Sequence, residues 1–383
     1  MEIARFWGTQ VTDADVALRL HDIETPFAVE MYGCNNITDA GMAHLRGIHS
    51  LKMMDCTNIT NATLVHLRGI HTLKINGYTD ITDAGLVYLR GIHTLDIDNC
   101  PNITDAGLVH LRGIRSLSIE NCPFITDAGL VHLRGIDELN LDDSISMITD
   151  AGLAHLRGIR CLNMMCRNNI TDTGLSYLRG ISQLSMTECP NITDAGLAHL
   201  RGIRSLNMID CPNITDAGLA HLRGIRSLNM IDCPNITDAG LFYLRGISNL
   251  LMDGCLNITD AGLAYLRGIH TLTMDGNNIT DVGLAHLRGI HTLSMDKCYN
   301  ITDAGLAHLR GIYSLQVIDF PRITDAGLVH LRGIHKLVMN DWPRVTNEGL
   351  FHLFGIHTLY VINCPRITNV KFVDAVVSTL SSS

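Results

Sequence analysis

Apolar residues recur along this chain with a long period of about 22 positions. Most units read Ile-Thr-Asp-Ala-Gly-Leu-x-x-Leu-Arg-Gly-Ile-x-x-Leu-x-Met and continue into a short polar segment that often holds Cys-Pro-Asn. From Ile37 to Ile367, thirteen of the fifteen gaps between equivalent residues are 22 residues long, one is 23 and one is 21. Two consecutive units, Pro190–Cys211 and Pro212–Cys233, are identical. Such a repeat predicts a solenoid, rather than the two or three globular domains that 383 residues alone would favour.

Each unit contains the pattern of one short strand and one short helix. The stretch Leu117–Ile119 alternates apolar and polar side chains, which predicts a strand. The stretch Asp127–Arg134 has the spacing of a short helical turn. Either Thr126 or Asp127 can cap its start, and Gly135 can end it in a left-handed conformation.

A unit of this size cannot bury its own apolar face, so neighbouring units must cover one another. Strands stacked on one side and wider helical turns on the other predict an α/β solenoid with a concave parallel sheet and short convex helices. We expect residues 1–33 to form a divergent N-terminal repeat and cap, and residues 34–370 to form about 15–16 repeats. Residues 371–383 are expected to be a C-terminal cap and tail, beginning with a capping helix.

The motif L-x-M-x-x-C-P-N-I-T-D-A-G-L resembles the cysteine-containing leucine-rich repeats of F-box substrate receptors. The resemblance covers roughly residues 11–370. It implies a leucine-rich repeat horseshoe that binds a protein, often one that is to be ubiquitinated. The units here are shorter than the family norm, and roughly the first 35 residues do not resemble an F-box.

Composition narrows the classes of partner. The net charge is −9, which disfavours nucleic acid and anionic membranes as main partners. The N-terminus has no secretory pattern, and no apolar stretch approaches the ~20 residues that span a bilayer. We therefore expect an intracellular, cytoplasmic protein, with the nucleus as an open alternative. Protonation of all 19 histidines would move the net charge to +10, so stability or solubility is expected to fall below about pH 6.

Ten of the twelve cysteines share one position of the unit, which Asn277 fills in another copy. A small polar side chain there can satisfy loop backbone groups inside the stack. We expect a ladder of reduced thiols, without disulfides and without the clustered pairs that zinc requires. Cys161 and Cys166 lie off this ladder, as a candidate reactive pair or as drift of that unit. The ladder comprises Cys34, Cys56, Cys100, Cys122, Cys189, Cys211, Cys233, Cys255, Cys298 and Cys364.

Two charged residues also recur in almost every unit, an Arg before Gly-Ile and an Asp after Thr. They form an Arg row from Arg46 to Arg332 and an Asp row from Asp39 to Asp325. Their nearly equal numbers lead to the hypothesis that the rows neutralise each other on the outer surface. The accompanying histidines, such as His44 and His49, are expected on a solvated convex or rim face.

Function should lie where the copies differ and side chains point outward, on the strands. An acidic series follows the strands and would either solvate the surface or attract a basic protein. Ile209, Ile231 and Leu251 are expected to form an exposed apolar patch. The candidate partner-binding residues are Lys52, Lys74, Asp96, Asp98, Ile209, Ile231, Leu251, Asp253, Asp275, Asp296, Val338 and Tyr360.

Nothing in the sequence predicts an enzyme. Each possible catalytic residue has many equivalents in identical surroundings, and no GxSxG, P-loop, HExxH or EF-hand motif occurs. We expect no catalytic residues, cofactor or metal. Three hypotheses stay open: a protein-interaction scaffold, a substrate receptor or adaptor of an SCF-type ubiquitin ligase, and a passive expanded repeat protein.

Overall fold

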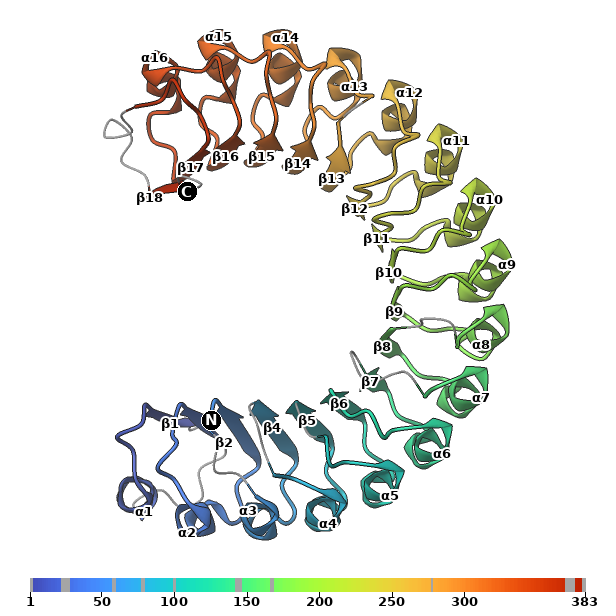
Figure 1. The fold of residues 1–383 in the computed structure, drawn as a ribbon, viewed down its shortest axis with the longest axis vertical. Helices are drawn as coiled ribbons and strands as arrows, with labels where there is room; N and C mark the ends of the chain where they lie inside the picture. Colours follow the sequence, from blue (N-terminus) through green and yellow to red (C-terminus); the bar gives the residue numbers. More distant parts are fainter. Residues whose placement is uncertain are drawn as a thin grey trace. The chain divides into compact units, whose positions relative to one another are not determined.

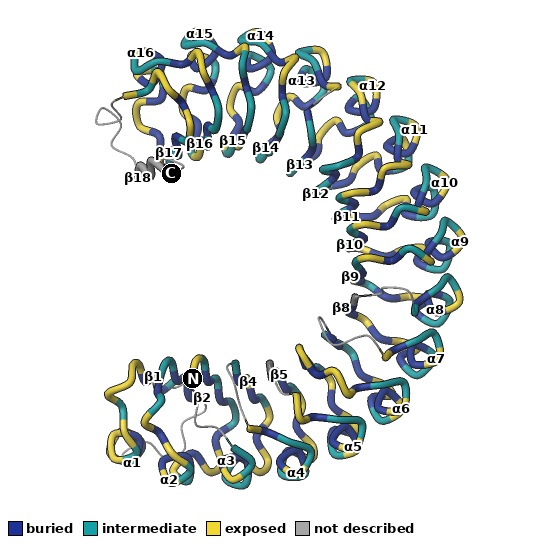
Figure 2. The backbone as a smooth tube through the Cα atoms, in the orientation of Figure 1, coloured by how far each residue is buried: buried dark blue, intermediate teal, exposed yellow. Residues whose placement is uncertain are grey.

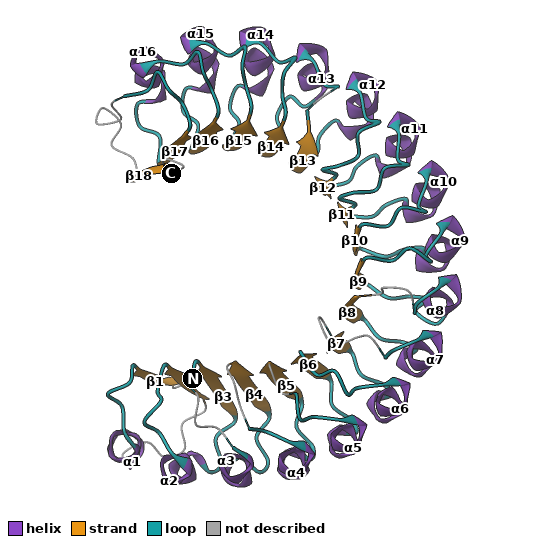
Figure 3. Cartoon of the chain, in the orientation of Figure 1, coloured by secondary structure: helices purple, strands orange, loops and turns teal. Residues whose placement is uncertain are grey.

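The computed structural model describes residues 3–21, 28–56, 60–76, 80–98, 101–141, 147–165, 169–276, 278–368 and 376–380. The chain divides into two compact units, Met1–Asn191 and Ile192–Ser383. Within each unit, a typical repeat contributes one strand, a loop and a short helix (Figure 1). The strands pair in parallel on the inner side and the helices lie on the outer side (Figure 3).

In the first unit, successive strands pair with matched register. Leu51 pairs with Leu73, and Leu73 pairs with Leu95. The strands are β1 (Ile3–Trp7), β2 (Ala28–Tyr32), β3 (Ser50–Met54), β4 (Thr72–Asn76), β5 (Thr94–Asp98), β6 (Ser116–Glu120), β7 (Glu138–Asn140), β8 (Cys161–Met165) and β9 (Gln183–Thr187). The helices are α1 (Asp13–His21), α2 (Asp39–Met42), α3 (Asn61–His66), α4 (Asp83–Leu86), α5 (Asp105–Leu108), α6 (Asp127–Leu130), α7 (Asp150–Leu153) and α8 (Asp172–Ser176).

The second unit repeats this arrangement. Its strands are β10 (Ser205–Ile209), β11 (Ser227–Asn229), β12 (Asn249–Leu251), β13 (Thr271–Asp275), β14 (Thr292–Asp296), β15 (Ser314–Ile318), β16 (Lys336–Asn340), β17 (Thr358–Ile362) and β18 (Val376–Leu380). Its helices are α9 (Asp194–Leu197), α10 (Asp216–Leu219), α11 (Asp238–Leu241), α12 (Asp260–Leu263), α13 (Asp281–His286), α14 (Asp303–Leu306), α15 (Asp325–Leu328) and α16 (Asn347–Leu350). The predicted C-terminal capping helix is wrong for 376–380, which pair in parallel with β17, while 371–375 lie outside the described residues.

The core lies between the strands and the helices of each unit (Figure 2). Leu117 and Ile119 of β6, and Leu130 and Leu133 behind them, are all buried. Burying one such side chain stabilises the folded state by about 1.5–3 kcal/mol. The predicted helical turn is the four-residue α6 followed by a 3-10 turn, and Gly135 ends it at a φ of 82°, as expected.

The repeated letters Thr-Asp-Ala-Gly form a bracket between neighbouring repeats. Thr126 is the helix cap, because its hydroxyl accepts from the backbone N–H of Ala128 at 3.2 Å. Asp105 of the preceding repeat accepts from the Thr126 backbone N–H at 2.8 Å and from its hydroxyl at 2.6 Å. Gly129 makes room for this carboxylate, because a methyl group there would overlap Asp105 Oδ1. At the N-terminal end, Asp15 accepts from the backbone N–H and the hydroxyl of Thr12, which lies three residues before it.

The contacts described for the Arg row are with aromatic side chains. Arg112 Nη2 donates to His132 Nδ1 of the next repeat at 3.1 Å. Where the next repeat has tyrosine, the guanidinium lies over the ring, as for Arg157 at 4.9 Å from the centroid of Tyr177. The hypothesis that the two rows neutralise each other is therefore wrong, since the Asp carboxylates are held by threonines and the described contacts of the Arg row are to rings.

The histidines that follow Gly-Ile, just before the strands, stack on one another through their rings. His49, His71 and His93 form one ladder, with centroids 4.4 Å apart. Burial, followed by the charges of the two neighbouring histidines, lowers the pKa of His71. A longer ladder in the second unit comprises His270, His291, Tyr313, His335 and His357 at 4.4–4.6 Å.

The cysteine ladder is confirmed for its nine described members, which are buried free thiols. Cys233 Sγ–H donates to the Met208 carbonyl of the preceding repeat at 3.4 Å. Burial raises the pKa of Cys233 to about 12, so the thiol stays protonated. Trp342 takes the same position and donates through its indole N–H to the Val317 carbonyl at 3.2 Å. Cys100, Cys166 and Asn277 lie outside the described residues.

Candidate protein-binding surface

The outward residues of the strands form the candidate surface in each unit. Along β10, Leu206 and Met208 are buried, whereas Ser205, Asn207 and Ile209 are only half-buried. The same alternation holds along β13. Because the registers match, each outward residue lies beside its equivalent on the next strand, and the surface is made of continuous rows.

In the first unit, three of the candidate residues on β3–β5 lie in one row. Lys52 pairs in register with Lys74, and Lys74 pairs with Asp96. Lys74 Nζ lies 3.4 Å from Asp96 Oδ2, and Lys52 Nζ lies 5.3 Å from the centroid of the Tyr32 ring. The two cations are thus held on the surface by neighbouring strands. Asp98 ends β5, but its side chain lies outside the described residues.

The three apolar candidates of the second unit lie in two adjacent rows. Ile209 ends β10, and Ile231 has the equivalent place two residues after β11. The Asp210 backbone N–H donates to the Ile231 carbonyl at 3.0 Å. Leu251 pairs in register with Asn229, which is one row closer to the strand start. All three are half-buried rather than fully exposed. They form a shallow apolar surface next to the carboxylates of the following strands.

The acidic series is not one strip. Asp275 and Asp296 are the last residues of their strands, and Asp253 has the equivalent place after β12. Asp210 and Asp232 instead occupy the next position, in left-handed turns with φ of 54° and 55°. Sequence reasoning merged these positions because substitutions at the strand ends shift the aspartate by one residue.

Carboxylates crowd together at the ends of β12–β14. Burial, followed by the charges of Asp275, Asp296 and Asp232, raises the pKa of Asp253 to about 6. Asp275 accepts from the Gly254 backbone N–H at 3.0 Å and lies 3.6 Å from Lys297 Nζ. The ends of these strands therefore carry unbalanced negative charge, which favours a cationic group on the partner.

Val338 and Tyr360 pair in register on β16 and β17, and both are half-buried. Ile318 and Ile362 end β15 and β17 and are also half-buried. This end of the second unit is thus more apolar than the ends of β12–β14. Sequence reasoning missed the stacked rings that precede the strands. Their signal in the sequence was the recurring aromatic residue after Gly-Ile.

The described residues contain no group of three or more His, Cys, Asp or Glu side chains that could hold a metal ion. Cys161 lies half-buried at the start of β8, where burial raises its pKa, so the thiol is less reactive than an ordinary one. In the part of the chain that the structure describes, we find no helix with the length and apolar character needed to cross a membrane.

These features define a leucine-rich repeat fold, with short parallel strands, short helices and a buried Cys/Asn-type position. Solved structures of this class are similar to the chain. A chain of the yeast Rad7 and Elc1 complex superposes with a TM-score of 0.54 at 16% identity, over 78% of this chain and 84% of that one. No protein-family model matches the sequence, and no curated protein does.

Two further similar structures are larger. A chain of the TLR13–ssRNA13 complex has a TM-score of 0.62 at 14% identity, over 94% of this chain and 58% of that one. A chain of the Drosophila Toll–Spatzle complex has a TM-score of 0.54 at 13% identity, over 97% of this chain and 55% of that one. This chain thus spans little more than half the length of either. At these identities the similarity establishes the fold.

Proposed function

We propose that the protein is a non-enzymatic scaffold that binds a protein partner on the outward strand faces. The observation that carries this proposal is the contrast between the two kinds of position. The Thr-Asp-Ala-Gly bracket, the Arg row and the thiol ladder serve contacts between repeats. The outward strand residues vary from copy to copy and form the outer face of the sheet, with an apolar patch at Ile209, Ile231 and Leu251.

Charge favours a basic partner. The carboxylates of Asp253, Asp275 and Asp296 lie beside the apolar patch, with Lys297 as the cation within ion-pair distance of Asp275. A partner with an apolar core and a cationic rim would match both features. A cytoplasmic location fits the reduced buried thiols, since such thiols persist in a reducing compartment.

The test is affinity purification of the full chain followed by substitution of the patch. The variant Ile209→Glu, Ile231→Glu and Leu251→Glu is expected to lose a reproducible partner. A matched control, Leu256→Glu, Val282→Glu and Phe351→Glu, adds the same charge at exposed positions off the strands and should retain it. Partner binding that survives in the patch variant contradicts the proposal.

An adaptor of an SCF-type ubiquitin ligase is the second candidate. Its support is the cysteine-containing repeat pattern, together with the similarity to a chain that is solved in complex with another protein, Rad7 with Elc1. The same purification separates the two candidates. Recovery of an F-box-binding adaptor and a cullin favours the ligase, whereas a different reproducible partner favours the scaffold. A clean negative favours a passive repeat protein.

A further inference from the structure

The last three repeats depart from the others at one loop position. After each strand, most repeats place an asparagine just before the Ile of Ile-Thr-Asp, and in the second unit this side chain links neighbouring repeats. Asn235 Nδ2 donates to the Pro212 carbonyl at 2.7 Å, and Asn257 Nδ2 donates to the Pro234 carbonyl at 2.8 Å. The final three repeats carry Arg322, Arg344 and Arg366 there, each after a proline.

These three arginines replace the asparagine that links neighbouring repeats. All three are exposed, and among the described residues none lies within ion-pair or hydrogen-bond distance of a partner. The arginines of the Arg row, by contrast, contact rings of the next repeat, as Arg310 does with His330. Stacking therefore does not account for the Pro-Arg series, which places one cation on each of three consecutive repeats.

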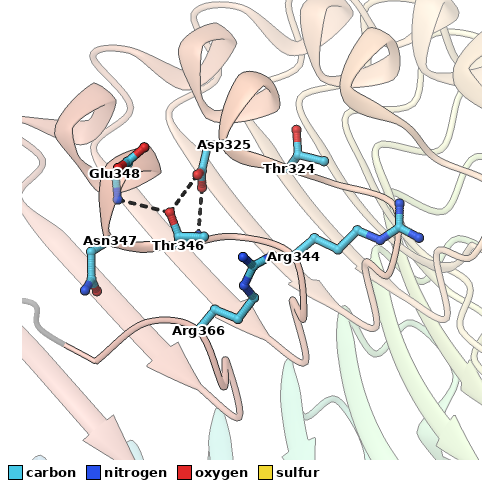
Figure 4. A pocket seen from close by; sticks show the side chains of 7 residues that line it. All are labelled: Thr324, Asp325, Arg344, Thr346, Asn347, Glu348 and Arg366. Carbon is cyan, nitrogen blue, oxygen red and sulfur yellow. Dashed lines mark hydrogen bonds between the residues drawn. The ribbon is translucent and has the colours of Figure 1, made fainter.

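Two of the three arginines border a groove of about 830 Å³. Arg344 and Arg366 reach it from the loops, and Thr324, Thr346 and Asn347 line it from the helix side (Figure 4). Asp325 is also part of the lining, but both of its oxygens accept from Thr346, at 2.7 Å. Glu348 completes the lining. The groove thus offers two guanidinium groups with polar neighbours, and the third arginine continues the row by one repeat.

We propose that the Pro-Arg row of Arg322, Arg344 and Arg366 binds an extended acidic peptide segment of a partner protein. Guanidinium groups pair with carboxylates through two parallel N–H donors, which makes arginine suited to this recognition. Adjacent strands are ~4.8 Å apart and packed helices ~8–10 Å apart, so loops between them have an intermediate spacing. Alternate side chains of an extended peptide are ~6.7 Å apart and match it.

The acidic residues of the groove favour a peptide over a nucleic acid. A polynucleotide carries a charge at every step, and Glu348 and the Asp325 carboxylate would repel it. A peptide can place acids opposite the arginines and turn neutral residues or backbone N–H groups toward Glu348. This site lies on the loops, separate from the outward strand face.

The test is fluorescence anisotropy with the full chain and a labelled peptide of eight residues that alternates Glu and Ser. The variant Arg322→Asn, Arg344→Asn and Arg366→Asn restores the residue that other repeats use and is expected to fold. We expect it to lose at least about tenfold in affinity. The control Arg288→Gln, Arg310→Gln and Arg332→Gln removes the same charge from the Arg row and should change affinity less than about twofold.

Several results would overturn the proposal. The Asn variant could bind the peptide as the unchanged protein does, or the Arg-row control could lose as much affinity as the Asn variant. Binding of a Gln-Ser peptide as tight as that of the Glu-Ser peptide would remove the charge argument. Tighter binding of an oligothymidylate probe would assign the row to nucleic acid instead. Circular dichroism melts of both variants check that the fold is retained.

Discussion

At the scale of the residue, the repeated letters are explained by contacts with the neighbouring repeat. The aspartate of one repeat holds the threonine of the next, and the glycine of that next repeat leaves space for the carboxylate, as with Asp216, Thr237 and Gly240. Each of these residues therefore depends on a residue of a neighbouring repeat, which explains why the units share them. A change at one of them should be felt across the boundary between repeats.

Gly240→Ala tests this dependence. A methyl group at Gly240 would overlap Asp216 Oδ1 and come within 3.0 Å of Leu219 Cδ1. We expect a loss of about 1–3 kcal/mol in the free energy of unfolding, measured with urea. In an Asp216→Ala background the same change should cost clearly less, because the carboxylate is gone and the close contact with Leu219 alone remains. Equal losses in both backgrounds would contradict the bracket.

At the scale of the element, the ends of β12–β14 are where like charges meet. The pKa of Asp253 is raised to about 6 from 3.8, first by burial and then by Asp275 and Asp296. Between these pH values the folded state binds more protons than the unfolded state. Stability from this group is therefore present below about pH 4 and is lost as pH rises through 6.

Asp253→Asn should remove that penalty at neutral pH. We expect a gain on the order of 1 kcal/mol at pH 7.5, after allowing for solvent screening of this partly exposed group, and no gain at pH 4. Urea unfolding of both proteins across this range provides the measurement. The control must be an aspartate outside the Asp row, because Asp260 and Asp238 accept hydrogen bonds from threonines of the next repeat. Asp137→Asn, in the first unit, provides a more exposed comparison.

The helices and strands also show which features could be predicted from the sequence. The strand at Leu117–Ile119 and the turn at Asp127 follow from local periodicity and glycine placement, so both could be predicted. The partners of the Arg and Asp rows could not, because spacing within one repeat does not say which residue of the next repeat is near. Val376–Leu380 was predicted as helix, yet its β-branched residues pair with the edge of β17. The candidate surface was found as a set of outward positions, but its division into rows needed the register.

At the scale of the whole molecule, every histidine except His21 belongs to one of two rows, beside the Arg row or in the stacked ladders. Beside the Arg row, an arginine of the preceding repeat donates to the histidine Nδ1, as in Arg288 to His308 at 3.0 Å. A protonated ring cannot accept that bond and places a second cation there. In the ladders, protonation places charges on rings about 4.4 Å apart.

Acid should therefore destabilise the protein. The pKa of His71 is lowered from 6.5, so the unfolded state takes up protons first as pH falls, and stability present above about pH 6.5 is lost below it. We expect thermal melts at pH 5.5 to lie below those at pH 7.5, with each exposed Arg–His contact worth roughly 0.5 kcal/mol. The variant His308→Tyr and His330→Tyr should lose less, because tyrosine at equivalent positions supports the arginine through its ring. A melting temperature that is unchanged between the two pH values would show that the histidine rows do not contribute to stability.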